Sequence, residues 1–277
     1  MAEAFSPSLS TVLGRSSCES AFYLYGDMDA DGIISQGEAL RLLYFQTAGP
    51  NWGTRFQPSW RNLKAHECEL EGVSCVDGKI IKIDLSEANL CSDGKGEKGS
   101  TGECGGLPAE LMYLSDSLEV LSLPRRRHLR GTLPSELGEL TKLQTLDLQD
   151  CALSGTIPSE LGNLANLKFL DISECNFRGT IPTELFRLTS LEKLNLSANQ
   201  ITGNLPSEIG NLKNVKEVKI SRAFLNGTLP ATIGDMPQIE NLELYGNFIS
   251  GSIPEELGKY TTLKRIGKSQ GYIMEKT

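Results

Sequence analysis

The sequence predicts an α/β solenoid, in which short repeated units stack side by side along one axis. Three observations lead to this prediction. From residue 131 onward a glycine recurs every 24 residues, at Gly131, Gly155, Gly179, Gly203, Gly227 and Gly251. A proline stands three residues after each glycine, and a pair of apolar residues separated by one position precedes it. A fixed period of this length is typical of solenoids, because no single unit buries its own apolar face.

Each unit is expected to begin with a strand. In residues 146–148, Leu-Asp-Leu has the two-residue period of a strand with one buried face, so Asp147 points outward. Regular strands are predicted to begin at Leu121, Leu146, Leu170, Leu194, Val218 and Leu242, with irregular ones at 83–85 and 263–266. The segment between Leu123 and Gly131 has one extra residue, which predicts a bulge in its Arg-rich run.

A turn and a short helical segment are expected to complete each unit. Where the chain leaves the strand, one position is occupied by Cys151, Cys175, Asn199 and Asn247. Asparagine can bond to the backbone of a neighbouring turn and cysteine can fill the place as a small buried thiol, so this position is structural. The glycine permits a tight bend, the proline fixes the next backbone angle, and stretches such as SELGNL supply the helical turn.

Together these residues, LxLxxNxLxGxIPxxLGxLxxL, resemble the plant-type leucine-rich repeats of receptor-like kinase ectodomains and polygalacturonase-inhibiting proteins. The resemblance covers roughly residues 39–266. It implies a right-handed superhelix with a parallel sheet along its concave side. It also implies a function in binding proteins or peptides rather than in catalysis.

An N-terminal cap must cover the first layer of such a solenoid. The segment from residue 39 to residue 75 resembles the cap of the same family, with an apolar helix, Trp52, Trp60 and a C-x-x-x-G-V-x-C closure. The resemblance implies a disulfide between Cys68 and Cys75.

The other cysteines are expected to differ in state. Cys91 and Cys104 flank a polar, glycine-rich insertion, which predicts a second disulfide that ties its ends. Cys151 and Cys175 lie one repeat apart, on strands spaced by ~4.8 Å, and their Cβ atoms are slightly too distant for a disulfide. We therefore expect two buried free thiols there. Cys18 is either free or paired outside the repeats.

The stretch GDMDADGIISQGEAL, residues 26–40, matches the calcium loop of an EF-hand. Counted from Asp27, the ligand positions are filled by Asp27, Asp29, Asp31, the carbonyl of Ile33, Ser35 and Glu38. Gly32 allows the sharp turn at position 6, and the opening Gly-Asp is closer to a dockerin-type single loop. The predicted cofactor is Ca²⁺, which stabilises the cap. The alternative is a solvated acidic turn that caps the following helix.

These expectations divide the chain into six segments. They are an N-terminal segment at 1–26, the calcium loop and cap helix at 27–49, the cap and first strand at 50–90, the insertion at 91–104, the repeats at 105–267 and a C-terminal tail at 268–277.

Composition and motifs exclude several classes of function. A net charge of -8 opposes nucleic-acid binding, and no apolar run approaches the ~18 residues of a membrane span. The chain has two histidines, His66 and His128, and neither lies in a recognisable spacing with a nucleophile or metal ligands, so we expect no catalytic residues and no enzyme.

The outward strand positions are the candidate partner-binding surface. They include Asp147, Phe169, Asp171, Lys193, Asn195, Lys219, Glu243 and Tyr245. Acidic residues gather in the middle repeats and basic residues follow, while Phe169 and Tyr245 are the aromatic anchors. The partner is expected to be a protein or peptide.

Two further functions remain open, a scaffold subunit of a larger assembly and a secreted enzyme inhibitor. The cysteine content favours an extracellular, secretory or organelle-luminal location, although residues 1–17 lack the features of a secretory signal. Asn195 and Asn226 fit the glycosylation motif, and the Arg-rich run at 125–130 is expected to be a solvated edge.

Overall fold

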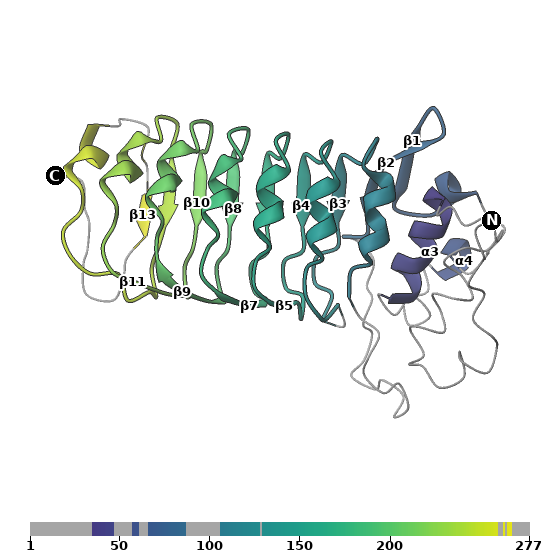
Figure 1. Ribbon diagram of the computed structural model, residues 1–277, viewed down its shortest axis with the longest axis horizontal. Helices are drawn as coiled ribbons and strands as arrows, with labels where there is room; N and C mark the ends of the chain where they lie inside the picture. The colour runs from purple at the N-terminus through teal and green to yellow at the C-terminus, as the bar shows by residue number, and fades with distance from the viewer. Residues whose placement is uncertain are drawn as a thin grey trace, which may run out of the picture.

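The computed structural model describes residues 35–46, 57–60, 66–86, 106–127, 129–259, 263 and 265–267. These residues form an elongated solenoid with a helical cap at its N-terminal end (Figure 1). Each repeat contributes one strand to a long sheet on one side and one short helix to the opposite side. The predicted α/β solenoid is confirmed.

The long sheet contains nine strands within the described residues. In spatial order they are β1 (Val73–Val76), β2 (Lys79–Asp84), β3 (Val120–Ser122), β4 (Thr145–Asp147), β6 (Phe169–Asp171), β8 (Lys193–Asn195), β10 (Glu217–Lys219), β12 (Asn241–Glu243) and β13 (Arg265–Gly267). Only β1 is antiparallel to its neighbour. The parallel register aligns Leu121, Leu146 and Leu170 and continues through the later repeats, as the period predicts.

A second sheet, which the sequence did not lead us to expect, follows the turn of four repeats. It contains β5 (Ser154–Gly155), β7 (Asn176–Gly179), β9 (Gln200–Asn204) and β11 (Phe224–Asn226), all paired in parallel (Figure 1). The glycine that recurs every 24 residues lies in β5, β7 and β9 and directly after β11, with Gly155 at φ 85° and Gly203 at φ 83°. A side chain is strained at such angles, which explains the glycine in each repeat.

The helical turns are 3₁₀ helices, each beginning after a proline where the repeats are regular. They are η3 (Ala109–Leu114), η4 (Ser135–Glu139), η5 (Ser159–Asn163), η6 (Thr183–Arg187), η7 (Ser207–Asn211), η8 (Ala231–Asp235) and η9 (Glu255–Lys259). Proline at the N-cap fits because its fixed φ matches the entry and its missing N–H needs no acceptor.

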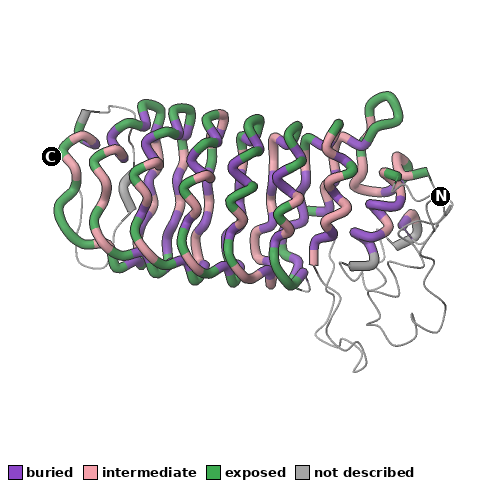
Figure 2. The backbone as a smooth tube through the Cα atoms, in the orientation of Figure 1, coloured by how far each residue is buried: buried purple, intermediate pink, exposed green. Residues whose placement is uncertain are grey.

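Leucine and isoleucine side chains from the long sheet, the turns and the 3₁₀ helices fill one continuous core. Buried residues accordingly recur in every repeat along the solenoid (Figure 2). Leu146, Leu161 and Leu170, for example, are fully buried. Each repeat thus covers the apolar face of its neighbour, which is how a solenoid replaces a compact core.

The position after each strand ties neighbouring repeats together. Asn199 donates from Nδ2 to the carbonyl oxygen of Ile172 at 2.9 Å, and its Oδ1 accepts from the N–H of Phe177 at 3.0 Å. Cys175 fills the same place one repeat earlier, with its thiol 3.4 Å from the carbonyl of Leu148. The structural role predicted for this position is confirmed.

Arg126 occupies this position in the first regular repeat, contrary to two expectations. Arg125 and Asp150 both have a positive φ, 61° and 52°, so they occupy equivalent positions in their repeats. The residues that follow them, Arg126 and Cys151, are therefore equivalent as well. Arg126 is 5% exposed, and its guanidinium donates to the carbonyl of Leu85. The extra residue therefore lies in the turn after Arg126 and makes no bulge in the strand pairing. The run is not a wholly solvated edge, because its second arginine is inside.

The cap comprises α3 (Gln36–Gln46), α4 (Gln57–Trp60) and η2 (Glu67–Glu69). Leu40 and Leu43 of α3 are buried in the same core as the first repeat. Tyr44 stacks on Trp60 with ring centroids 5.8 Å apart, and Nε1 of Trp60 donates to the carbonyl of Glu71 at 2.9 Å. The helical cap is thus continuous with the solenoid.

Candidate functional site

The outward face of the long sheet, which we call the sheet face, is assembled by the parallel register. Asp147, Asp171, Asn195, Lys219 and Glu243 lie opposite one another on successive strands and form one column. Phe169 and Lys193 belong to the neighbouring column. The structure therefore brings the predicted partner-binding residues together on one surface, with Tyr245 just beyond the end of β12.

Asp171 differs from the expectation that it points into solvent. It is 7% exposed, and Oδ1 accepts from the N–H of Ser173 at 2.9 Å and from its hydroxyl at 2.5 Å. Its Oδ2 accepts from Nδ2 of Asn195 at 2.9 Å. Neighbouring polar side chains thus cover this carboxylate and satisfy it, as buried charges require.

Asp147 is the more available carboxylate. It is partly buried, and Oδ1 accepts from the N–H of Gln149 at 3.3 Å. Burial is the main cause that raises the pKa of Asp147, and the negative charge of Asp171 adds to it. No ion pair to either carboxylate is found among the described residues, whereas Asp84 pairs with Lys82 at 2.9 Å.

The basic half of the sheet face is less open than the sequence suggests. Lys219 pairs with Glu217 of the same strand at 2.6 Å, and that carboxylate raises the pKa of Lys219. Arg222 lies over the ring of Tyr245, with its guanidinium carbon 5.9 Å from the centroid. Lys193 is the exposed cation of the predicted set. On this face Lys193 and the carboxylates of Asp147, Asp171 and Glu243 therefore have no ion pair among the described residues.

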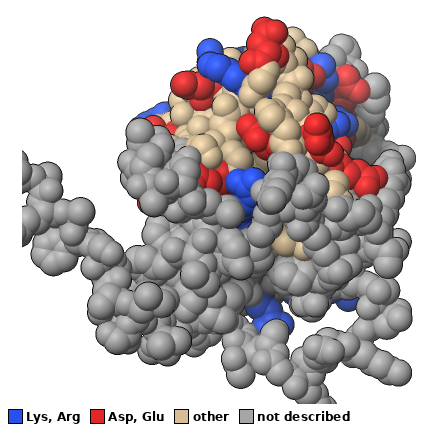
Figure 3. All heavy atoms as spheres, turned by 90° about the vertical axis from the view of Figure 1, so that its right-hand side faces the viewer, with Lys and Arg blue, Asp and Glu red and all other residues tan. Residues whose placement is uncertain are grey.

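The described part of the N-terminal end carries side chains of both signs of charge. Figure 3, which views the N-terminal end, shows acidic and basic side chains interspersed, with no continuous basic patch on the described part of that face.

The predicted calcium loop lies mostly outside the described residues, which exclude Asp27, Asp29, Asp31 and Ile33. Its last two ligands, Ser35 and Glu38, form a reciprocal capping box at the start of α3. The N–H of Ser35 donates to Oε2 of Glu38 at 2.6 Å, and the N–H of Glu38 donates to Oγ of Ser35 at 3.3 Å. The Glu38 carboxylate is therefore folded back toward the residues that precede the helix.

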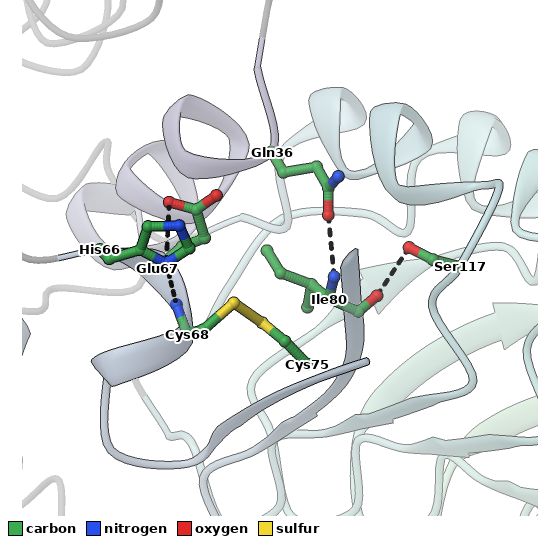
Figure 4. Close-up of a disulfide and its surroundings, with 7 residues drawn as sticks. All are labelled: Gln36, His66, Glu67, Cys68, Cys75, Ile80 and Ser117. Carbon is green, nitrogen blue, oxygen red and sulfur yellow. Dashed lines mark hydrogen bonds and ion pairs between the residues drawn. A yellow bond between two sulfur atoms is a disulfide. The ribbon is translucent and has the colours of Figure 1, made fainter. Parts of the chain in front are cut away.

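The cap meets the solenoid at Ile80 (Figure 4). Its N–H donates to Oε1 of Gln36 at 2.9 Å, and its carbonyl accepts from the hydroxyl of Ser117 at 2.7 Å. Gln36 belongs to α3 and Ser117 follows η3, so one residue of β2 links the cap helix to the first repeat. Anything that orders the start of α3 acts directly on this junction.

The predicted disulfide between Cys68 and Cys75 is present and ties η2 to β1 (Figure 4). Cys151 and Cys175 are free and buried, as predicted. A hydrogen bond to Cys175, together with burial, raises the pKa of the Cys151 thiol. The Cys91–Cys104 pairing and the state of Cys18 concern positions outside the described residues.

The two glycosylation motifs stand in different surroundings. Asn195 uses its amide nitrogen to donate to Asp171 and to Oγ of Ser173, at 2.9 and 3.1 Å, so a glycan there would break both bonds. Asn226 is exposed on β11. Use of either motif stays a prediction.

Nothing in the described residues resembles a catalytic or metal centre. His66 accepts a hydrogen bond at Nδ1 from the N–H of Cys68 at 3.2 Å, and His128 lies outside those residues. Among the described side chains no group of three or more His, Cys, Asp or Glu is placed to hold a metal ion. The described helices are also too short or too polar to cross a bilayer.

Comparison with known proteins agrees with this geometry. Residues 146–270 match the model of a leucine-rich repeat region. The chain is 32% identical to the leucine-rich repeat receptor-like serine/threonine-protein kinase RGI4 of Arabidopsis thaliana over 97 residues. These 97 residues are 35% of this chain and 8% of that kinase.

Three solved structures share the repeat architecture. A plant ice-binding protein is 26% identical with a TM-score of 0.68, covering 84% of this chain and 70% of that one. The Arabidopsis receptor kinase HAESA, solved with the peptide hormone IDA and the co-receptor SERK1, is 30% identical with a TM-score of 0.65, covering 83% and 37%. The GASSHO1/SCHENGEN3 ectodomain of Arabidopsis thaliana, with CASPARIAN STRIP INTEGRITY FACTOR 2, is 26% identical with a TM-score of 0.56, covering 82% and 35%. The leucine-rich repeats are thus similar to those of receptor ectodomains, which are binding modules rather than enzymes.

Proposed function

We propose that this protein is a non-enzymatic recognition module whose sheet face binds a protein or peptide that presents a basic side chain. The observation that carries the proposal is Asp147, a partly buried carboxylate beside Asp171 with no cation paired to it among the described residues. The similarity to ectodomains solved with peptide ligands supports a partner of this class.

Asp147 lowers the stability of the free protein, because burial and the charge of Asp171 both disfavour its ionised form. A Lys or Arg from a partner would remove this cost and add a charge-assisted hydrogen bond. Residues that reduce stability in the free state are typical of binding sites. An extracellular or luminal location fits the Cys68–Cys75 disulfide, which persists in oxidising compartments.

A library of immobilised random eight-residue peptides tests the proposal. Peptides that bind the full chain are expected to be enriched in Arg or Lys, and Asp147→Asn is expected to abolish that enrichment. Asp150→Asn is the matched control, because it removes the same charge from a side chain already paired with Arg127 at 3.5 Å. Enrichment that survives Asp147→Asn, or bound peptides without basic residues, would contradict the proposal.

A second candidate function, binding to ice, is favoured by a row of exposed residues along the edge where the strands of the second sheet end. One exposed column contains Thr132, Thr156, Thr180, Asn204, Thr228 and Ser252. The methyl carbons of Thr132, Thr156 and Thr180 each lie against the glycine of the next repeat, which gives these side chains one common orientation. A regular array of hydroxyls and methyls is suited to ordering water, and a solved plant relative binds ice.

Ice recrystallisation in the presence of the purified chain tests this second function. If the threonine column binds ice, the wild type is expected to keep crystals small, and Thr156→Lys with Thr180→Lys is expected to remove the effect. Ser154→Lys with Thr202→Lys, in a column of the second sheet two residues before the threonine column, is the control. Coarsening of crystals with the wild-type chain would exclude ice binding and leave peptide recognition untouched.

We also propose that calcium binds the loop formed by Asp27, Asp29, Asp31, Ile33, Ser35 and Glu38 and stabilises the cap. The proposal rests on the ligand spacing of the loop; the capping box places Ser35 and Glu38 at the start of α3, which is the position that both the calcium loop and the acidic turn require. Carboxylate, hydroxyl and carbonyl oxygens are the ligands that Ca²⁺ prefers. A ligand at ~100 times its dissociation constant would add about 2.7 kcal/mol to the stability of whatever folds with the loop.

Titration calorimetry and melting curves with calcium, magnesium or chelator test the calcium proposal. Calcium is expected to bind and to raise the melting temperature, magnesium to substitute poorly, and Glu38→Gln to lose most of the effect. Asp77→Asn, an exposed acidic turn elsewhere in the cap, is the control. No heat of binding at millimolar calcium would identify the stretch as an acidic turn.

A further inference from the structure

Two phenylalanines occupy a solvent-facing position of the second sheet. Phe224 and Phe248 stack with ring centroids 6.2 Å apart, and they are 48% and 68% exposed. In earlier repeats the same position holds Asn176 and Gln200, which are also exposed. An exposed aromatic pair where other repeats have polar side chains indicates a surface that packs against another group.

Asn226 lies beside both rings. It follows Phe224 by two residues on β11, where the residues alternate exposed, buried, exposed, so the two side chains share the outer face of the sheet. β11 pairs with β9 at an interval of 22 residues, and the bridge between Thr228 and Ser250 keeps the same interval toward the next repeat. Phe248 is therefore opposite Asn226 in the register of this sheet.

Asn226 also begins an Asn-Gly-Thr sequence, which is the acceptor motif for N-linked glycosylation. Its side chain makes no hydrogen bond to any described residue. In the equivalent position of other repeats, the hydroxyl groups of Ser154, Thr202 and Ser250 each donate to a glycine carbonyl of the preceding repeat. The amide nitrogen of Asn226 is thus exposed and available for a covalent bond.

The other acceptor motif, at Asn195, is engaged within the fold. Nδ2 of Asn195 donates to Oδ2 of Asp171 at 2.9 Å and to Oγ of Ser173 at 3.1 Å, in a partly buried setting. A glycan leaves that nitrogen a single hydrogen, so at least one of these bonds would be lost. The carboxylate of Asp171, which is 7% exposed, depends on such donors. A chain glycosylated at Asn195 would therefore fold less stably.

We propose that Asn226 carries an N-linked glycan whose first N-acetylglucosamine packs against Phe224 and Phe248. The C–H groups on the face of the sugar ring have a partial positive charge, which the negative face of an aromatic ring attracts. This inference rests on the luminal or extracellular location proposed above. In the transfer, Nδ2 of Asn226 forms a bond to the anomeric carbon of a lipid-linked oligosaccharide. The bond from that carbon to the lipid diphosphate breaks, the amide loses one proton, and the lipid diphosphate leaves.

The glycan belongs to a different surface from the proposed peptide site. Asn226 is part of the second sheet, whereas Asp147 and Asp171 belong to the long sheet (Figure 1). Removal of the glycan is therefore expected to leave peptide binding unchanged, and the two proposals can fail independently.

Secretion of the full chain from human cells, behind an added signal peptide, tests occupancy. Peptide N-glycosidase in heavy-oxygen water converts each glycosylated asparagine into a labelled aspartate, which mass spectrometry locates. We expect the label at Asn226 and none at Asn195. Thr228→Val is expected to abolish the label, and valine can keep the methyl contact of Thr228 with Gly251. A secreted chain that lacks the label at Asn226, or carries it at Asn195, would overturn the proposal.

Melting curves test whether the sugar packs on the rings. Trimming by an endoglycosidase that leaves the first N-acetylglucosamine is expected to preserve the melting temperature, whereas complete removal is expected to lower it by about 2–4 °C. In Phe224→Ser with Phe248→Ser, complete removal is expected to cause no shift. Tyr113→Ser, which removes another ring that is 49% exposed, is the control and should keep the full shift. Equal shifts in all three proteins would show that the sugar does not contact the rings.

Discussion

The position after each strand shows how one side chain sets the energetics of a repeat. Asn199 and Asn247 each donate to a carbonyl of the preceding repeat and to one of their own, and each accepts a main-chain N–H. Between them, the equivalent residue is Ala223, which is 3% exposed and offers no polar atom to its surroundings. One repeat of the series thus lacks its side-chain tie.

Replacing Ala223 by asparagine is expected to stabilise the protein by about 1 kcal/mol. Asn199 donates to the carbonyl groups 27 and 3 residues before it. The carbonyl groups at the same spacing before residue 223 are those of Leu196 and Ile220, and the new side chain can donate to them. Denaturant unfolding measures the change. Ala223→Leu, similar in size but without polar atoms, is expected to destabilise, and equal effects of the two variants would refute the hydrogen-bond explanation.

The pKa of Asp147 leads to a pH-dependent prediction. Because its pKa is raised, the folded state holds the proton more tightly than the unfolded state, so its contribution favours folding below pH 3.8 and is lost as pH rises through the folded pKa. At pH 7 the ionised carboxylate is a net cost. Asp147→Asn is therefore expected to raise the melting temperature at pH 7.

The difference in melting temperature between wild type and Asp147→Asn should shrink as the pH is lowered toward 3.8 and below. Asp150→Asn, which loses its ion pair with Arg127, should not raise the melting temperature at either pH. A gain from Asp147→Asn that is the same at all pH values would mean that charge is not its cause.

At this scale the sequence predicted the role of the turn residues but not every occupant. Cys175 and Asn199 follow the 24-residue interval and were predicted from it. The interval does not predict Arg126, because the extra residue lies after that arginine. The burial of Asp171 also could not be predicted from strand alternation. It depends on Ser173 and Asn195 from two different repeats, which fold over the carboxylate.

At the scale of elements, neighbouring 3₁₀ helices are packed so closely that one position in most of them accepts only glycine. Gly138, Gly162, Gly210 and Gly234 have no room for a Cβ, because the backbone or Cβ of the next helix lies against them. Phe186 takes the equivalent place in η6 and is fully buried. Correspondingly, η6 and η7 are the least closely packed neighbours among the regular helices.

Gly162→Ala is expected to destabilise the protein by about 1–3 kcal/mol, since its methyl group would overlap the carbonyl of Glu184. Gly258→Ala in η9 is the matched control, because nothing lies within 4 Å of its Cβ position. Equilibrium unfolding of the two variants decides the matter, and equal stabilities would show that the helices separate without cost.

The second sheet is the element that sequence reasoning missed. Its strands are two to five residues long and three of the four contain glycine, so they lack the length and the regular apolar alternation that identify a strand from sequence. They form because stacking at a fixed interval brings equivalent turns within hydrogen-bonding distance. By contrast, the long sheet follows from apolar alternation that is visible in each repeat.

At the scale of the whole molecule, stability is expected to vary along the solenoid rather than to be uniform. Each repeat contacts mainly its neighbours, so loss of the cap should loosen nearby repeats more than distant ones. The thiols of Cys151 and Cys175 can report local opening by their rate of labelling, because both are buried and free. They lie in consecutive repeats, with Cys151 nearer to the cap.

Replacing both Cys68 and Cys75 by serine removes the cap disulfide, which is worth about 2–3 kcal/mol for such a short loop. Thiol labelling is expected to accelerate at both reporters, and more at Cys151 than at Cys175. Amide exchange in β12 should change little. Equal acceleration at all three places would mean that the solenoid unfolds as a single cooperative unit.

The hydrogen bonds of the turn residues also impose an order on how the chain is made. The carbonyl of Ile172 is satisfied by Asn199, which is 27 residues later in the sequence. The carbonyl of Ile220 likewise has no side-chain donor until Asn247 has been synthesised. At ~5–20 residues per second, a ribosome needs about 1–5 s to deliver that distance. During synthesis the newest repeat is therefore always incomplete, and the growing end remains open to chaperones until the next turn emerges.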